Sequence, residues 1–143
     1  MNLTFQEKSY WASLIIMSVV WVNYFVRIQP ALNTGTINRE ETIGLFIGAV
    51  VVLVTLEVVV HIVLAVTNLR TANKPSDERD KSFNSKAGNI AGWVLGFCVV
   101  MIAGLAVFKD VSSMLIANLL LLALVMSKCV DYALALFYYR RGW

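Results

Sequence analysis

The sequence predicts an all-α polytopic membrane protein, with four transmembrane helices arranged as two hairpins and both termini in the cytoplasm. Of its 143 residues, 59% are hydrophobic and 15% are charged. A soluble domain is about 45–50% apolar and about 25% charged, so the solvent for most of this chain is lipid. The few basic residues cluster near helix ends rather than along one face, which argues against nucleic acid as a partner.

Four apolar runs are each long enough for the roughly 20 helical residues that cross a bilayer core. We expect a single four-helix domain, 1–143, with spans at 5–27, 43–69, 87–108 and 111–139 and a cytoplasmic loop at 70–86. Thr4 and Glu7 form a T-x-x-E capping box, which predicts that the first helix begins near Phe5. The short link Lys109–Asp110 predicts a tight antiparallel hairpin between the third and fourth helices.

Positive charges predict the orientation of these spans. One side would carry Lys8, Arg70, Lys74, Arg79, Lys81, Lys86, Arg140 and Arg141, and the other only Arg27, Arg39 and Lys109. The excess of Lys and Arg on cytoplasmic loops places both termini and the middle loop inside. Trp21 and Tyr24 would mark the outer interface, and both prolines, Pro30 and Pro75, would lie in loops.

Glycines at four-residue spacing predict helix contacts. They are Gly44 and Gly48 in the second helix, and Gly88, Gly92 and Gly96 in the third. Apolar side chains do not drive helices together in lipid, whereas small residues let backbones approach closely. We therefore expect a contact stripe, either within the monomer or between protomers of a homo-oligomer.

Two acid–base pairs interrupt the apolar helices. Glu57 and His61 are spaced i,i+4, and Lys128 and Asp131 are spaced i,i+3, so each pair shares a helix face. Ionisable groups at membrane depth usually face a bundle interior and pair with one another. Counted from the helix ends, Glu57 lies level with Lys128, and His61 with Asp131, so an interhelical network would form if the second and fourth helices are neighbours. The alternatives are a local interfacial pair of Lys128 with Asp131 and a dedicated ion or substrate site.

The middle loop carries the string Asp77, Glu78, Arg79 and Asp80, followed by Lys86-Ala87 and a glycine-rich helix. It is either a polar helical turn that starts the third helix or a docking surface for a soluble partner. This pattern resembles a group of uncharacterised small four-helix proteins of the bacterial inner membrane, which share a DER-type loop before the third helix. The resemblance implies a bacterial inner-membrane location and no particular activity.

The function predicted from these features is an oligomeric structural, accessory or sensory membrane component. The alternative is a small proton-linked transporter or channel that uses Glu57 and His61. We find no catalytic motif and expect no enzymatic activity. We also expect no cofactor, because His61 is the single histidine and would need ligands from another protomer to hold haem or a metal. The expected partners are the lipid bilayer, further copies of the chain and a soluble or membrane protein.

Overall fold

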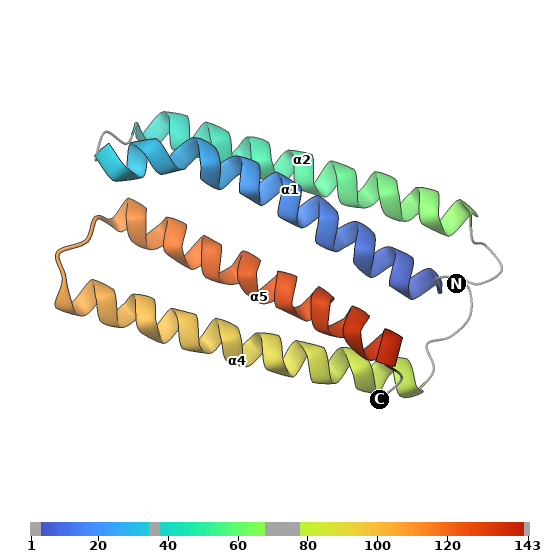
Figure 1. Cartoon of the computed structure of the whole chain (residues 1–143). Helices are drawn as coiled ribbons and strands as arrows, with labels where there is room; N and C mark the ends of the chain where they lie inside the picture. The colour runs from blue at the N-terminus through green and yellow to red at the C-terminus, as the bar shows by residue number, and fades with distance from the viewer. Residues whose placement is uncertain (1–3, 35–37, 68–77, 142–143) are drawn as a thin grey trace. The chain divides into compact units, whose positions relative to one another are not determined.

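The computed structural model describes residues 4–34, 38–67 and 78–141, and these residues form helices without strands. The helices are α1 (Phe5–Thr34), α2 (Arg39–Thr67), α4 (Glu78–Phe108) and α5 (Ser113–Arg141) (Figure 1). Each one is long and apolar enough to cross a membrane. The predicted all-α polytopic fold is thereby confirmed.

The chain forms two compact units, Met1–Lys74 and Pro75–Trp143. In the first unit α1 packs antiparallel to α2, and in the second α4 packs antiparallel to α5 (Figure 1). We call them the first and the second hairpin. The association of both hairpins into a single four-helix domain stays a prediction.

Side-chain caps explain where the helices begin. The backbone N–H of Thr4 donates to Glu7 Oε2 at 2.8 Å, and the N–H of Glu7 donates to Thr4 Oγ1 at 3.2 Å. This reciprocal arrangement is the predicted capping box, and it starts α1 at Phe5. Asn38 caps α2 by accepting from the N–H of Glu40 at 3.1 Å, and Ser112 caps α5 by accepting from the N–H of Leu115 at 3.3 Å.

The first helix is longer than expected. It continues to Thr34, past the predicted end at residue 27, so Pro30 lies inside the helix and its placement in a loop was wrong. Proline removes one N–H donor and so leaves one carbonyl of the preceding turn without its helical bond. Only one turn follows Pro30, and Thr34 Oγ1 donates to the Pro30 carbonyl at 3.0 Å, which ties that turn together.

The third helix begins at Glu78, in the polar helical turn that the sequence offered as its start. Residues 78–86, expected within the loop, form the first turns of α4, and the acidic Glu78 and Asp80 in its first turn complement the positive end of the helix dipole. The remainder of the expected loop, which includes Pro75 and Asp77, lies outside the described residues. The fourth span runs over 113–141 rather than 111–139.

The second hairpin closes on alanines. Ala87 and Ala91 of α4 are 0% and 4% exposed, and Ala123 and Ala135 of α5 are 4% and 1% exposed. Ser127 Oγ donates to the Ala91 carbonyl at 2.8 Å across the same contact. Small side chains and one interhelical hydrogen bond are the means by which membrane helices approach closely.

The first hairpin is closed by larger side chains. Trp21, Tyr24 and Ile28 of α1 are buried, and the rings of Trp21 and Tyr24 lie 6.3 and 6.5 Å from the ring of Phe46 on α2. The two aromatic residues that were expected to mark the outer interface are therefore part of the helix contact. The reason is that they follow the buried i,i+3/i+4 stripe of α1, which faces α2.

Candidate functional site

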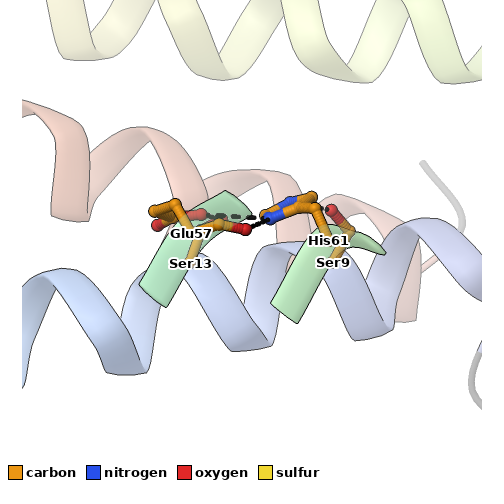
Figure 2. Close-up of polar contacts among 4 residues, drawn as sticks. All are labelled: Ser9, Ser13, Glu57 and His61. Atoms are coloured by element: carbon orange, nitrogen blue, oxygen red, sulfur yellow. Dashed lines mark hydrogen bonds and ion pairs between the residues drawn. The ribbon is translucent and has the colours of Figure 1, made fainter. Parts of the chain in front are cut away.

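Four polar side chains form one hydrogen-bonded row between α1 and α2 (Figure 2). Ser13 Oγ donates to Glu57 Oε2 at 2.9 Å. Glu57 Oε2 lies 3.2 Å from His61 Nδ1, and His61 Nε2 lies 2.9 Å from Ser9 Oγ. We call this set, Ser9, Ser13, Glu57 and His61, the polar row.

The polar row arises from matching spacings on two antiparallel helices. Ser9 and Ser13 are four residues apart on α1, and Glu57 and His61 are four residues apart on α2, so each pair occupies one helix face. Because the helices run in opposite directions, the first serine meets the histidine and the second meets the carboxylate. The row covers about 6 Å along the helix axis at the end of the hairpin opposite its turn.

The hydrogen bonds define the protonation pattern of neutral His61. Nδ1 lies 2.8 Å from the backbone carbonyl of Glu57, an oxygen that can only accept, so Nδ1 carries the proton. Nε2 then accepts from Ser9 Oγ. If His61 takes up a second proton, Nε2 donates to Ser9 instead, and the added charge lies beside the Glu57 carboxylate. The row can therefore hold one extra proton without losing a hydrogen bond.

The same atoms have the order of a Ser–His–acid triad, but the backbone does not favour nucleophilic catalysis. Ser9 lies in the second turn of α1, where backbone N–H groups bond to carbonyls one turn earlier. Acyl transfer also requires N–H donors directed at the developing oxyanion. What the row itself provides is a chain of hydrogen bonds that joins the two helices.

The polar row is partly accessible. The side chain of Glu57 is 25% exposed and that of His61 is 40% exposed. Among the described residues, no buried side-chain nitrogen or oxygen lacks a hydrogen-bond partner. Glu57 is thus hydrogen-bonded inside its own hairpin.

Sequence reasoning found Glu57 and His61 and missed their serine partners. A serine in an apolar helix is common, and its i−4 carbonyl is always within reach as a partner. The available signal was the repeated four-residue spacing. Two serines near the start of α1 and two ionisable residues near the end of α2 lie at the same level of an antiparallel hairpin of these lengths, whereas the rotation of each helix decides whether they face one another.

The second acid–base pair lies in the second hairpin. Lys128 Nζ donates to Asp131 Oδ2 at 3.1 Å, with side chains 52% and 20% exposed. Asp131 Oδ1 lies 4.0 Å from the position that a Cβ on Gly88 would take, which is an ordinary van der Waals distance and places the carboxylate beside this glycine. The local i,i+3 pair weighed from the sequence is present. The pairing of Glu57 with Lys128, and of His61 with Asp131, stays a prediction.

The other glycines of the predicted stripe face open space. A Cβ added at Gly44, Gly48, Gly92 or Gly96 would meet no atom of a neighbouring helix within 4 Å. These glycines therefore do not mediate the helix contact within either hairpin. In α4 that role belongs to Ala87 and Ala91, each one position before a glycine of the stripe.

Open space beside two of these glycines forms a groove between α1 and α2. Its volume is about 410 Å³, and its lining extends from Arg27 near the turn to Leu56, the residue before Glu57. Asn23, Tyr24, Gly44 and Gly48 also line it, and the remaining residues are aliphatic.

Other candidates from the sequence are placed as follows. In the described part of the chain, no three His, Cys, Asp or Glu side chains gather where they could hold a metal ion. Cys98 and Cys129 are not joined in a disulfide. Of the acidic–basic string, Glu78, Arg79 and Asp80 belong to α4, with Glu78 exposed.

No protein-family model, curated protein or solved structure matches this chain.

Proposed function

We propose that this protein is a non-enzymatic component of a bacterial inner-membrane assembly, with a structural, accessory or sensory role and an oligomeric state. The observation that supports it most is the internal compensation of its charges. Glu57 is hydrogen-bonded within the first hairpin, and Asp131 is paired within the second. Such self-contained charges leave a stable apolar surface for packing rather than a site that awaits a substrate.

The open glycine face of α4 gives this proposal a means of assembly. Gly92 and Gly96 leave backbone accessible on a side of α4 that α5 does not cover. A helix from a second copy can approach such a face closely and gain dispersion energy there. The charged first turn of α4, with Glu78, Arg79 and Asp80, is the surface that we assign to a soluble or membrane protein partner.

Charge placement supports an orientation with both termini in the cytoplasm. Lys8 lies near the start of α1. Lys81 and Lys86 lie near the start of α4, and Arg140 and Arg141 lie at the end of α5, so these four lie at the end of the second hairpin opposite its turn. Arg27, Arg39 and Lys109 lie near the turns. The positive-inside rule then directs both turns to the periplasm.

A second candidate function is proton-linked transport, which one specific observation favours. The groove ends at Leu56, directly beside the polar row, so groove and row together follow the α1–α2 contact from Arg27 to Ser9. Glu57 and His61 would then exchange a proton as part of each transport cycle.

One experiment separates the two candidates. We would reconstitute the wild-type protein, the Glu57→Gln variant and a matched Asp131→Asn control in liposomes. Proton flux would be followed with an entrapped pH dye, and the oligomeric state by analytical ultracentrifugation in detergent. The assembly role predicts no flux in any variant and an oligomer in the wild type.

Flux in the wild type and in Asp131→Asn that disappears in Glu57→Gln, with the oligomer intact, would establish transport instead. A monomeric wild-type protein would overturn the oligomeric part of the first proposal.

A further inference from the structure

The groove of the first hairpin is a candidate binding site whose occupant neither proposed role identifies. It lies between α1 and α2 in the half of the hairpin nearer the turn and has a volume of about 410 Å³. That volume is within the range of about 300–1,000 Å³ typical of small-molecule sites. Because both helices are long and apolar enough to cross a membrane, the groove lies at the depth of the lipid chains.

Glycine is the reason that the groove exists. Gly44 and Gly48 line it, and a Cβ at either position would meet nothing within 4 Å. On the opposite wall, Val20 and Tyr24 of α1 line the groove. The walls are otherwise aliphatic, so the part of an occupant that lies along the groove must be apolar.

Arg27 places a positive charge at the end of the groove near the turn. It is the single charged residue of the groove lining, and within the described residues no carboxylate lies within 4.0 Å of it. Glu40 and Glu41 lie in the first turn of α2, are exposed, and do not line the groove. Arg27 follows Phe5 by 22 residues of helix, or about 33 Å, which is close to the roughly 30 Å thickness of the hydrocarbon core.

An apolar groove that ends in a cation at the membrane surface has the chemistry of an anionic lipid site. The geometry points to an anionic phospholipid bound to the first hairpin, with an acyl chain in the groove and the phosphate at Arg27. The charge complementarity selects this occupant, because a neutral helix would leave Arg27 without a partner. Asn23 lies one turn before Arg27 and offers its amide to the same headgroup. This inference does not depend on either proposed function.

Native mass spectrometry of the purified protein tests this site. Wild-type protein in detergent would be titrated with phosphatidylglycerol and, separately, with phosphatidylcholine. We expect a preference for the anionic lipid that Arg27→Gln lowers about fivefold, since one basic residue near a membrane surface contributes about that factor. Arg39→Gln is the matched control, because Arg39 is an exposed cation near the same turn and does not line the groove.

A second variant tests the groove itself. Gly48→Leu directs a side chain into the open space and should lower the binding of both lipids, while an unchanged melting temperature shows that the hairpin is folded. Gly44→Leu serves the same purpose if Gly48→Leu does not fold. Equal effects of Arg27→Gln and Arg39→Gln would overturn the site in favour of general surface charge. Unchanged lipid binding in Gly48→Leu, together with a loss of oligomers, would show that a second copy of the chain fills the groove.

Discussion

The two hairpins of this protein share an architecture and use their small residues in opposite ways. In the second hairpin, Ala87 and Ala91 of α4 are fully enclosed against α5, and small size serves close approach. In the first hairpin, Gly44 and Gly48 of α2 border an open groove, and small size serves to leave space. A stripe of small residues in a membrane helix therefore indicates a special surface without stating whether that surface is closed or open.

The hairpins also differ in how they treat polar groups. Across the second hairpin, Ser127 donates to a backbone carbonyl that already accepts a helical bond. Across the first, Ser13 donates to the carboxylate of Glu57, which has few other donors. The bond from Ser13 satisfies a carboxylate, whereas the bond from Ser127 only adds to a carbonyl that is already bonded within its helix. The following substitutions test these differences, in order of expected effect.

Overpacking the alanine contact should have the largest effect. Ala91→Leu forces a large side chain between α4 and α5 and should lower the free energy of unfolding by about 1–3 kcal/mol. Gly92→Leu is the control at the next position, where the Cβ meets nothing, and should change stability little. Unfolding by SDS titration in mixed micelles measures both, and an equal loss in the two variants would show that α4 also packs tightly on its glycine face.

Removing one serine from each hairpin compares the two kinds of hydrogen bond. Ser13→Ala deprives an ionised carboxylate of its donor, so the loss should approach the upper membrane value of about 1.7 kcal/mol. Ser127→Ala leaves a carbonyl that keeps its helical bond, so the loss should be near the average of about 0.6 kcal/mol. The same SDS titration applies. A smaller loss for Ser13→Ala would mean that water or Lys128 already satisfies Glu57.

The helix caps provide a weaker comparison. Thr4→Ala removes the two bonds of the Thr4 hydroxyl, to the N–H and to the carboxylate of Glu7, while the backbone N–H of residue 4 still donates to Glu7, and it should cost about 1 kcal/mol. Ser112→Ala removes a single bond of 3.3 Å and should cost less. Amide hydrogen exchange of the first turns of α1 and α5 reports the two effects separately, and faster exchange in α5 than in α1 would contradict the ranking.

The smallest effect is expected at the exposed ion pair of the second hairpin. Lys128→Met breaks the bond to Asp131, and an i,i+3 pair on a helix surface contributes about 0.2–0.5 kcal/mol. The melting temperature in detergent should move little. A large loss of stability would favour the predicted interhelical network, in which Lys128 also pairs with Glu57. In that case the effects of Lys128→Met and Glu57→Gln on stability would not add in the double variant.

Several features could be predicted because they are local. Thr4 and Glu7 are three residues apart, so their reciprocal bonds depend on one helical turn alone, and the capping box was confirmed. The short link at Lys109 and Asp110 forces α4 and α5 into a hairpin, whatever their side chains. The continuation of α1 through Pro30 was missed because the local penalty of proline is offset by its place in the last turn.

The contacts of the site could not be predicted, because they depend on how each helix is rotated about its axis. The sequence offered Gly88, Gly92 and Gly96 as a contact stripe, whereas the structure turns α4 so that Ala87 and Ala91 meet α5. The same rotation on α1 brings Ser9 and Ser13 to His61 and Glu57. A difference of one position along a helix is about 100° around it, so neighbouring residues lie on different faces.

By itself, the sequence determined the four apolar helices, the capped start of α1 and the positions of the ionisable residues along the helices. Hydrophobicity and bonds within single turns decide those features, and both are written in consecutive residues. Only the tertiary structure decided which helix faces meet, and with them the polar row and the groove. In lipid every apolar face is equally well solvated, so the choice of face depends on close packing and interhelical hydrogen bonds, which arise only when two helices are brought together.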